Sequence, residues 1–383
     1  MDTLLDGVEV VWTPLGEVAD YEQPTKYLVK SQNYSDDFKT PVLTAGKTFI
    51  LGYTDETNGI YNASKNPVII FDDFTTANKW VDFDFKAKSS AMKMITSKNE
   101  SVILLRYIYH WINTLPSGLI EGDHKRQWIS NYSYKLIPIP PLNIQAEIVR
   151  ILDTFTELTA ELTAELTAEL AARKKQYTYY RDKLLTFEEG EVEWKALGEV
   201  TEFSNGKGHE KDIIEDGKYI VVNSKFISTD GQVAKYSNKQ ICPLIIDDIL
   251  IVMSDLPNGK ALSKTFIVDK NDKYTLNQRI GKISVKNKQV LLPKFLQYFL
   301  NRTPQLLKYN NGVGQTNLRK AQILGIQVPI PPLSEQERIV SILDKFDTLT
   351  TSITEGLPRE IELRQKQYEY YRNMLLSFPK EGV

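Results

Sequence analysis

The chain of 383 residues contains a single cysteine, Cys242, which excludes an intrachain disulfide and suits a reducing compartment. It has no run of 18 apolar residues, so no transmembrane helix is predicted. Its N-terminus lacks the basic segment and apolar stretch of a secretory signal, and a cytoplasmic location is expected. An excess of basic residues is also missing, because 47 lysines and arginines face 49 acidic residues. Any binding of nucleic acid must therefore depend on local positive surface or on a partner.

The motifs of several enzyme classes are missing as well. There is no Asn/Asp-Pro-Pro-aromatic tetrapeptide of an amino-methyltransferase, and Gly312-Val313-Gly314 does not continue as a dinucleotide-binding fingerprint. The three histidines lie far apart and, with one cysteine, make no metal-binding spacing. The acidic pair in residues 71–74 (FDDF) is typical of a turn at the end of a strand. We therefore expect a chain that is not itself an enzyme and that holds no metal or cofactor.

What the sequence does contain is an internal repeat. The sequence PIPPL occupies residues 138–142 and again 329–333, an offset of 191, and the match runs without a gap from Pro138 to Phe187. A second match, at an offset of 182, carries Trp12 and the following LGEV onto Trp194 and its LGEV. Residues 19–136 and 201–327 show no identity that can be aligned by eye. The plan is therefore variable half, repeated spacer, variable half, repeated spacer.

This plan predicts four regions and a symmetry. The first globular domain is expected at residues 1–140, a central helical spacer at 141–187, a second globular domain at 188–331 and a C-terminal helical spacer at 332–383. Residues 187–194 (FEEGEVEW) show how the last residues of the chain could join to the first. The repeat therefore predicts neighbouring ends and a pseudo-two-fold axis.

The spacers are expected to be long helices. From Ile148 the apolar residues recur every three or four positions, and alanine, glutamate and leucine fill most of the rest. A helix that is continuous from Leu142 to Phe187 would have about 46 residues and a length of roughly 69 Å. Such an apolar stripe needs a partner helix, for which the second spacer is the obvious candidate. Gly356 and Pro358 predict a kink or a short break in that second helix.

The middle of the first spacer is a tandem repeat. Residues 159–170 are three copies of Thr-Ala-Glu-Leu, which is a strongly helical and low-complexity sequence. Each copy adds about 6 Å of helix and a rotation of about 40°, a rise comparable with one or two base pairs of DNA. A change in the number of copies would alter the separation and twist of the two halves while leaving both intact.

Each spacer ends in a basic and aromatic segment, at residues 173–177 and 364–368. One interpretation is a solvated helix C-terminus, where cations are favoured by the helix dipole. The other is a docking surface for a partner protein, and its repetition suggests two partners or two copies of one. The candidates for partner docking are Tyr177, Tyr180, Tyr368 and Tyr371.

The alternation of variable and repeated blocks, the spacer entry PIPPL-x-x-Q-x-x-I-V-x-I-L-D and the exit K-Q-Y-x-Y-Y-R together resemble type I restriction–modification specificity subunits. The resemblance covers the whole chain, and Thr-Ala-Glu-Leu units are also like those of some members of the family. It implies an α+β fold with two globular α/β target-recognition domains, separated by two long helices that form an antiparallel, pseudo-two-fold symmetric coiled coil. Each domain would read one half of a split site in double-stranded DNA.

The resemblance also implies partners. Two copies of a DNA adenine methyltransferase subunit would dock on the spacers and bring S-adenosylmethionine, and motor-nuclease restriction subunits would join that core. Two alternatives stay open from the residues themselves. One is a coiled-coil scaffold with two protein-binding domains, which the net charge of −2 favours. The other is a DNA-methylating enzyme with its own catalytic domain.

The two variable halves have parallel layouts despite their different residues. Each is expected to contain a short apolar strand followed by a polar stretch, at 68–71 and 249–253. An extended segment follows at 86–93 and 277–279, then an apolar helix at 102–115 and 294–300, and then a last polar loop at 124–126 and 315–320.

The polar loops supply the candidates for DNA contact, although any one of them is equally well explained as an ordinary exposed residue. Arginine, asparagine and glutamine can read base edges in the major groove, whereas lysine and hydroxyl groups mostly hold phosphates. A compact basic patch at residues 124–126 includes His124, and Thr316 belongs to the last loop of the second half. The candidates for base contact are Thr76, Asn78, Lys79, Ser89, Ser90 and Arg126 in the first half and Asn277, Gln278, Arg279, Gln315 and Asn317 in the second. The candidates for phosphate contact are Lys47, Lys88, Lys93, Lys125, Lys260 and Lys320.

Overall fold

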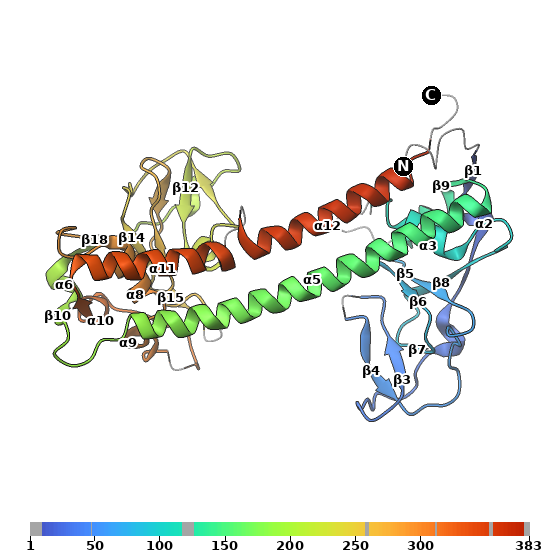
Figure 1. Ribbon diagram of the computed structural model, residues 1–383, viewed down its shortest axis with the longest axis horizontal. Coiled ribbons are helices and arrows are strands. Elements are labelled where there is room, and N and C mark those ends of the chain that lie inside the picture. The colour runs from blue at the N-terminus through green and yellow to red at the C-terminus, as the bar shows by residue number, and fades with distance from the viewer. Residues whose placement is uncertain are drawn as a thin grey trace. The chain divides into compact units, whose positions relative to one another are not determined.

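The computed structural model describes residues 10–46, 48–116, 126–256, 260–310, 312–351 and 355–378. The chain divides into two compact units, which do not follow the order of the sequence. Unit 1 consists of Met1–Ala164 and Glu362–Val383, and unit 2 consists of Glu165–Ile361. Each unit therefore combines one globular part with segments of both spacers, and Figure 1 shows the strands and helices of each along the chain.

The globular part of unit 1 is built on three small sheets. The largest has the strand order β2-β8-β5-β6 with antiparallel neighbours, and a three-stranded sheet has the order β4-β3-β7. Strands β1 and β9 pair antiparallel, so that the two ends of the globular part leave side by side. Its elements are β1 (Val11–Pro14), α2 (Leu15–Val18), β2 (Ala19–Glu22), η1 (Pro24–Tyr27), β3 (Thr40–Leu43), β4 (Ile50–Thr54), β5 (Val68–Asp72), β6 (Asn78–Val81), β7 (Lys86–Ala87), β8 (Met92–Ser97), α3 (Leu105–Ile112), α4 (Gln127–Ser130), η2 (Tyr132–Tyr134) and β9 (Leu136–Ile139).

Unit 2 repeats this topology. Its four-stranded sheet has the order β11-β18-β14-β16, its three-stranded sheet has the order β13-β12-β17, and β10 pairs with β20. A further short pair, β15 with β19, forms in this unit. Its elements are β10 (Glu193–Ala196), α6 (Leu197–Val200), β11 (Thr201–Asn205), η3 (Glu210–Asp212), β12 (Tyr219–Val222), α7 (Ser224–Ser228), β13 (Tyr236–Ser237), β14 (Ile249–Val252), β15 (Ser254–Asp255), β16 (Thr265–Ile267), β17 (Tyr274–Leu276), β18 (Ile280–Val285), α8 (Pro293–Leu300), α9 (Pro304–Leu307), β19 (Thr316–Asn317), α10 (Lys320–Leu324) and β20 (Gln327–Ile330).

The central strand of each four-stranded sheet is buried on both faces, and its residues alternate between two cores. In unit 1, Ile69 and Phe71 of β5 face a core that includes α3 and the spacer helices, whereas Val68 and Ile70 face the three-stranded sheet. In unit 2, Ile249 and Ile251 of β14 face α8 and the spacer helices, and the intervening residues face the three-stranded sheet. The continuous apolar runs at 68–71 and 249–252 are therefore central strands that are covered on both faces of the sheet.

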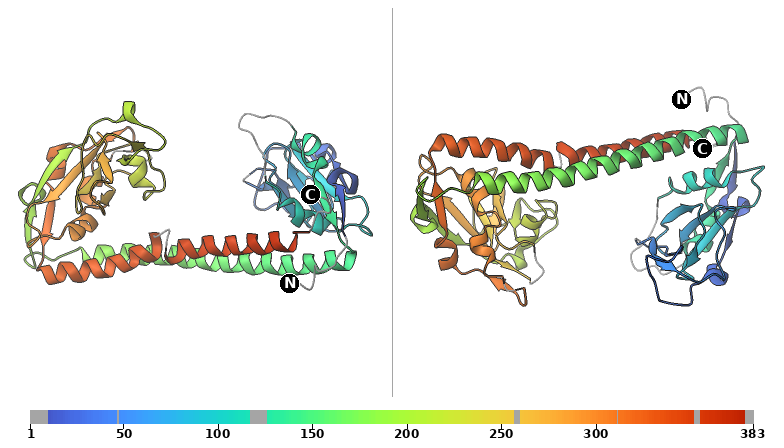
Figure 2. Two further views of the ribbon diagram at one scale, coloured as in Figure 1. Left: turned by 90° about the horizontal axis from the view of Figure 1, so that it is seen from above. Right: turned by 60° about the horizontal axis from the view of Figure 1, so that its bottom comes forward.

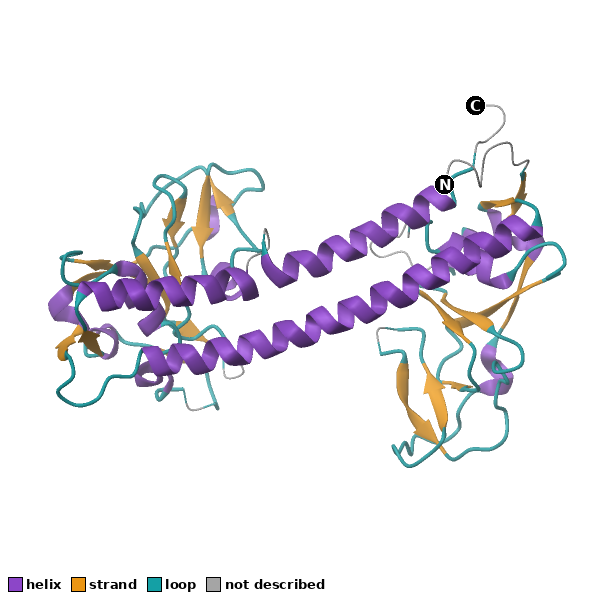
Figure 3. Ribbon diagram, in the orientation of Figure 1, coloured by secondary structure: helices purple, strands orange, loops and turns teal. Residues whose placement is uncertain are grey.

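The first spacer is one helix, α5 (Leu142–Leu184), which confirms the predicted helix except for its last three residues. Figure 2 shows its continuity and Figure 3 distinguishes the helices from the strands of each unit. The second spacer is broken as predicted, into α11 (Leu333–Thr351) and α12 (Gly356–Leu375). Gly356 has a φ of +80°, and a Cβ there would lie 2.6 Å from the Thr348 carbonyl oxygen, so this break requires glycine.

Within each unit, α5 packs against the second spacer. In unit 1, Phe155 lies 5.7 Å from the Tyr371 ring and Thr156 donates a hydrogen bond to the Tyr368 hydroxyl, so the two helices run antiparallel there. In unit 2, Tyr180 stacks on Phe346 at 5.7 Å. The predicted apolar stripe of α5 is not covered at every position, because Leu158 is 56% exposed.

One local expectation is wrong and one holds. Residues 277–279 do not continue as an extended segment, because residues 278 and 279 form the turn that joins β17 to β18. Near the two ends of the described part of the chain, Leu375, Leu376 and Phe378 pack in the same core as Leu15 and Ile148 of unit 1, in line with the neighbouring ends that the repeat predicts.

Candidate nucleic-acid interface

The point where each globular part meets α5 or α11 is built on one buried glutamine. Gln145 accepts a hydrogen bond from the Leu104 backbone N–H (2.9 Å) and donates to the carbonyls of Val102 (2.9 Å) and Pro140 (2.8 Å). Gln336 makes the same three bonds in unit 2, with Leu292 (2.8 Å), Val290 (2.9 Å) and Pro331 (2.8 Å). Both glutamines are fully buried. The two globular parts are therefore attached to their helices in the same way.

Corresponding lysines show that the variable halves share a frame. Lys98 donates to the Gly16 carbonyl (2.7 Å) in unit 1, and Lys286 donates to the Gly198 carbonyl (3.1 Å) in unit 2. Each lysine is followed directly by an asparagine. After two further residues comes the Val-x-Leu segment whose backbone groups are hydrogen-bonded to the buried glutamine. The two halves therefore contain an alignable segment, at 98–104 and 286–292, that the inspection of the sequence missed.

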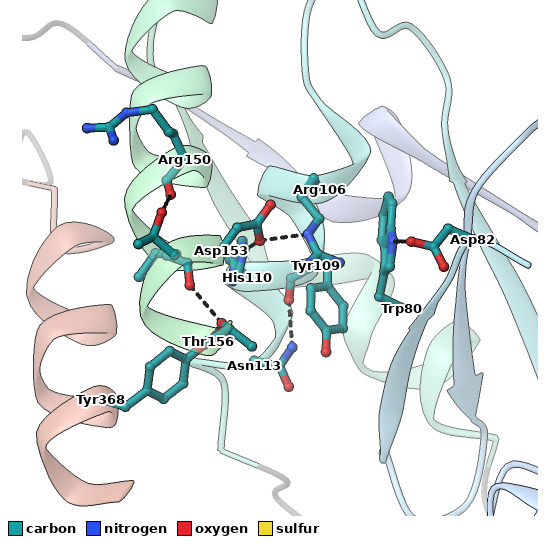
Figure 4. A network of polar contacts seen from close by, with 12 residues as sticks. Trp80, Asp82, Arg106, Tyr109, His110, Asn113, Arg150, Asp153, Thr156 and Tyr368 are labelled. Atoms are coloured by element: carbon teal, nitrogen blue, oxygen red, sulfur yellow. Dashed lines mark hydrogen bonds and ion pairs between the residues drawn. The ribbon is translucent and has the colours of Figure 1, made fainter. Parts of the chain in front are cut away.

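About two turns of helix farther along, an aspartate of the spacer meets the helix of each globular part. In unit 1, Asp153 accepts hydrogen bonds at 2.8 Å from both Arg106 Nε and His110 Nε2, as Figure 4 shows. Burial alone would raise the pKa of Asp153, but these hydrogen bonds outweigh it and hold the pKa below its usual range. Burial lowers the pKa of the His110 imidazole, although Asp153 opposes this shift.

Unit 2 uses different side chains at the same place. The Tyr298 hydroxyl donates to Asp344 Oδ1 at 2.5 Å, and Lys294 Nζ lies 3.5 Å from the same oxygen. Burial and the hydrogen bond to Asp344 raise the pKa of Tyr298 far above its ordinary value. A histidine and an arginine in unit 1 thus correspond to a tyrosine and a lysine in unit 2.

In unit 1, three segments meet at one end of the central strand β5. The Asp73 backbone N–H donates to the Ala91 carbonyl (3.2 Å), and its own carbonyl accepts from the Gln127 N–H (2.8 Å). These bonds bring Phe74, Ser89 and Ser90 to the same end of the strand as Arg126. We call Phe74, Ser89, Ser90 and Arg126 the first edge; all four are exposed.

In unit 2, the same backbone bonds bring together the corresponding segments. The Met253 N–H donates to the Arg279 carbonyl (3.2 Å), and the Met253 carbonyl accepts from the Leu318 N–H (2.7 Å). Ser254 pairs with Asn317 across β15 and β19. The second edge consists of Ser254, Asn277, Gln278, Arg279, Gln315 and Asn317.

Within the second edge, several polar side chains are already hydrogen-bonded. Gln315 Nε2 donates to Ser254 Oγ (2.7 Å), and Gln278 Nε2 donates to Glu210 Oε1 (3.2 Å). Asn277 accepts from the Gln278 backbone N–H (2.6 Å) and is half-buried. Arg279 and Asn317 are exposed. The edge therefore presents amide and guanidinium groups from two separate segments of the chain, beside the Ser254 hydroxyl of a third.

Most of the other candidates are accessible, but several are outside both edges. In unit 1, Lys79 is exposed on β6, Asn78 accepts from Asn113 Nδ2 (3.0 Å) and Lys88 donates to the Tyr34 hydroxyl (3.0 Å). In unit 2, Lys260 is exposed, and Lys320 Nζ lies 5.7 Å from the centre of the Phe203 ring. The candidates that lie outside the described residues are Lys47, His124 and Lys125.

Three candidates are buried, contrary to expectation. Lys93 has no exposed side-chain surface and lies 3.3 Å from Asp73 Oδ2, so it cannot reach a phosphate. Thr76 is 6% exposed at a φ of +61°, because it closes the turn between β5 and β6. Thr316 is 8% exposed and its hydroxyl faces Asn310. Residue type alone could not show that these polar groups serve the interior.

Two residues of the edges, Phe74 and Ser254, were missed, as was the buried Asp73 behind the first edge. Asp72 makes the expected turn at the end of the strand, accepting from the Phe74 N–H (2.8 Å), but Asp73 turns inward and is fully buried. Phe74 is an exposed aromatic residue beside it, and Ser254 occupies the corresponding place in unit 2. The signal in the sequence was a second acidic residue directly after a strand that is otherwise apolar.

The four tyrosines predicted to dock a partner instead contact the neighbouring helix of their own unit. Tyr368 and Tyr371 pack against α5 in unit 1, and Tyr177 and Tyr180 pack against Phe346 in unit 2. Burial raises the pKa of Tyr177 to about 12. Their neighbours Tyr179 (62%) and Tyr370 (64%) are more exposed and occupy equivalent positions of the repeat, while Tyr180 itself is 38% exposed.

The described residues offer neither a candidate membrane-spanning helix nor a candidate metal cluster. No helix among them is long and apolar enough to cross a membrane. No group of three or more histidine, cysteine, aspartate or glutamate side chains in the same residues is arranged to hold a metal ion.

Comparison with known proteins gives a consistent result. The family model of the type I restriction modification DNA specificity domain matches the chain twice, over residues 8–172 and 189–363. The chain is 54% identical to a type I restriction enzyme specificity subunit of Escherichia coli, over 99% of this chain and 97% of that protein. It is 34% identical to another such subunit of Haemophilus influenzae, over 99% and 98% of the two chains.

Solved structures share the fold at low sequence identity. A chain from a structural study of complex assembly and conformational transition in the type I restriction–modification system has a TM-score of 0.60 at 18% identity, covering 97% of this chain and 98% of that one. The specificity subunit of M. genitalium has a TM-score of 0.51 at 16% identity and covers 98% of both chains.

Proposed function

The chain belongs to the type I restriction–modification DNA specificity family, and we propose that unit 1 and unit 2 each read one half of a bipartite site in double-stranded DNA. The observation that carries this proposal is the pair of edges. Both are assembled by the same backbone hydrogen bonds at the end of the central strand, yet they present different side chains. A shared frame with different donors and acceptors is what two readers of unlike half-sites require.

The edges supply the chemistry for reading bases. Arg126 and Arg279 carry the forked donors that match guanine, and Asn277, Gln278, Gln315 and Asn317 carry amides of the kind that pair with adenine. Lys79, Lys88, Lys260 and Lys320 would hold phosphates beside them. Because the chain has a net charge of −2, much of the phosphate contact would come from partner subunits.

The spacers set the distance between the half-sites in this proposal. α5 is a single helix through all three Thr-Ala-Glu-Leu units, so it transmits a change of length from one globular part to the other. We propose that it forms an antiparallel, pseudo-two-fold symmetric coiled coil with α11 and α12. The antiparallel contacts within unit 1 support this arrangement.

The partners would be two copies of a DNA adenine methyltransferase subunit, which bind S-adenosylmethionine, together with restriction subunits. Catalysis belongs to these partners, and the site of action is the cytoplasm. Tyr179 and Tyr370 support a pair of equivalent docking surfaces, because both are exposed at the same position of the repeat. We add them to the four tyrosines first considered, which also contact the neighbouring helix of their own unit.

The experiment is a map of methylated adenines in cells that contain this chain and its methyltransferase subunit. We expect a bipartite site with two unlike halves. Deletion of Thr167–Leu170 shortens α5 by about 6 Å and should shorten the gap by about one or two base pairs without changing the bases read. Unchanged spacing would contradict the role of α5 as a spacer, and methylation without a bipartite site would contradict the proposed function.

A further inference from the structure

Unit 1 contains a buried ion pair where unit 2 has none. Asp73 and Lys93 both have fully buried side chains, and Lys93 Nζ lies 3.3 Å from Asp73 Oδ2. The backbone bonds that define the edges place Asp73 at the position of Met253, and the pairing of β8 and β18 places Lys93 at the position of Gly281. The shared fold therefore does not need this pair of charges.

The pair is also poorly explained by stability. Neither Lys93 Nζ nor Asp73 Oδ2 makes a hydrogen bond with any other described residue. A buried pair of charges whose remaining hydrogen-bonding capacity is unmet is commonly no more stable than an apolar replacement. Stability therefore does not explain the charged pair, and its role in unit 1 must be one that Met253 and Gly281 do not have at the same positions of unit 2.

The Asp73 carboxylate holds one exposed residue of the first edge. Its Oδ2 atom lies 3.5 Å from Arg126 Nη1, and its Oδ1 atom accepts from the Trp128 backbone N–H (2.8 Å). The Phe74 ring lies 5.9 Å from the Arg126 guanidinium carbon. Arg126 is thus fixed from two sides while 48% of its side chain stays exposed. A guanidinium has five N–H donors, so contact with one carboxylate oxygen leaves others for a ligand.

The position of Arg126 corresponds to a base-reading candidate in unit 2. The residue after Arg126 donates its backbone N–H to Asp73, and the residue after Asn317 donates its backbone N–H to Met253. Arg126 and Asn317 are therefore equivalent, and both are exposed. Their side chains prefer different bases, because arginine pairs with guanine and asparagine with adenine.

We infer that Asp73 is a positioning residue that, with Phe74, holds the Arg126 guanidinium for contact with a guanine in the half-site read by unit 1. Lys93, whose Nζ atom lies 3.3 Å from Asp73 Oδ2, supplies a positive charge that stabilises the buried carboxylate. The inference rests on the proposed function, since it names how one of its two edges is prepared. A guanidinium fixed before binding loses less conformational freedom in the complex, which favours the correct base over its competitors.

The test uses the complete complex with its methyltransferase subunits, and it measures methylation of a library of sites that differ at single base pairs. Arg126→Ala should lower discrimination at one base pair of one half-site by roughly tenfold or more. The double variant Asp73→Asn with Lys93→Met keeps the acceptor for the Trp128 N–H and avoids leaving a lone buried charge. It should lower discrimination at the same base pair. In the Arg126→Ala background it should cause no further loss, because Asp73 acts through Arg126.

Two further variants keep the outcome clear. Phe74→Leu removes the ring from an exposed position, so it should fold and weaken the same discrimination by a smaller factor. Arg150→Ala removes an exposed arginine on α5, away from both edges, and should leave every base preference unchanged.

The possible results separate the inference from the proposed function. If Arg126→Ala relaxes one base pair but the double variant does not, the positioning role of Asp73 is wrong and the reading of DNA by unit 1 stands. If the double variant lowers methylation of all sites equally and also lowers the melting temperature, Asp73 is only structural and the inference fails. If Arg126→Ala weakens all sites equally, Arg126 contacts the backbone and the inference also fails. If the native complex methylates no bipartite site, the proposed function itself is wrong.

Discussion

Unit 1 and unit 2 agree most closely where they join their helices and differ most at their edges. The buried glutamines Gln145 and Gln336 make the same three hydrogen bonds to within 0.1 Å. At the edges, the same backbone bonds carry Arg126 in one unit and Asn317 in the other. Between these extremes lies the pair of spacer aspartates, which keep their place but change their partners. Side chains therefore vary more as their distance from the joint increases.

This gradient teaches how one fold can serve two recognition tasks. Backbone hydrogen bonds fix the positions of the edge residues whatever the side chains are, so a substitution at the edge does not disturb the frame. The glutamine joint requires one particular side chain, because it satisfies three backbone groups at once. A globular part can therefore change what it reads and still attach to the spacers.

The largest effect is expected at the joint, where the two units should respond alike. Gln145→Leu leaves two carbonyls and one N–H without their partner and should destabilise unit 1 by about 2–4 kcal/mol. Gln336→Leu should destabilise unit 2 by a similar amount. Hydrogen exchange measured separately for the two units would give both values, with Gln365→Leu, an exposed residue of α12, as the control. A large loss in one unit only would show that the joints are not equivalent.

The next effect is expected at the second edge, where the units should differ. Arg279→Ala should cost roughly 1–3 kcal/mol of discrimination at one base pair of the half-site read by unit 2, and leave the other half-site unchanged. Methylation rates on single-substitution libraries would measure it. Equal loss of binding to all sequences would assign Arg279 to the phosphate backbone instead.

A smaller effect is expected for the exposed tyrosines of the repeat. Tyr179→Ala and Tyr370→Ala should each weaken binding of a methyltransferase subunit by about 1–2 kcal/mol, because each substitution removes an exposed aromatic side chain that contacts the partner in the proposed complex. Titration calorimetry would measure the two affinities. Tyr177→Ala is the matched comparison: it should lower the stability of unit 2 through lost packing on Phe346. Unequal losses at Tyr179 and Tyr370 would contradict two equivalent docking surfaces.

The smallest expected effect is a difference in the pH dependence of stability between the sites of the two spacer aspartates, Asp153 and Asp344. Burial lowers the pKa of His110 below its ordinary value of 6.5, so the unfolded state takes up a proton first as the pH falls. Unit 1 should therefore lose stability as the pH falls from about 7 through 6.5 and towards the lower pKa of the folded state. Asp153 loses its contribution only at more acidic pH, because its pKa lies below 3.8.

The Tyr298–Asp344 site of unit 2 should show no such loss between pH 7 and 5.5, since Tyr298 stays neutral there. His110→Tyr, which introduces the residue of unit 2, should remove the pH dependence of unit 1. The charged groups that face His110 are Asp153, Arg106 and Arg372. Hydrogen exchange of the backbone amides around His110 and around Tyr298, at pH 7 and at pH 5.5, would measure the loss of stability at each site. Equal losses at the two sites would contradict the prediction.

The sequence predicts the architecture well and the edges only in part. The repeat of PIPPL and the helical spacing locate α5 and the break at Gly356, because periodicity and helix breakers act locally. The apolar runs at 68–71 and 249–252 mark the central strands for the same reason. The alignable segments at 98–104 and 286–292 were missed because they are only seven residues long and stand at an offset of 188, different from those of the two longer matches.

The edges were harder to predict because burial is a property of tertiary structure. Lys93 and Thr76 have the composition of DNA contacts, but the sheet and the turn place them in the interior. Asp73 has the composition of a turn residue, but it is buried beneath Arg126. The tyrosines show the same limit, since helical phase decides how far each member of a Tyr-Tyr pair is exposed, and the phase depends on which helix packs beside it.

The most direct test of the shared frame is to make the two globular parts the same. The paired strands give matched boundaries, Val11 with Ile139 in unit 1 and Glu193 with Ile330 in unit 2, so residues 193–330 can replace residues 11–139. Methylated adenines would then be mapped for the complex of this chain with its methyltransferase subunits. We predict sites that carry two copies of the half-site read by unit 2, at the native spacing. A folded complex that still methylated the native asymmetric site would contradict the assignment of one half-site to each unit.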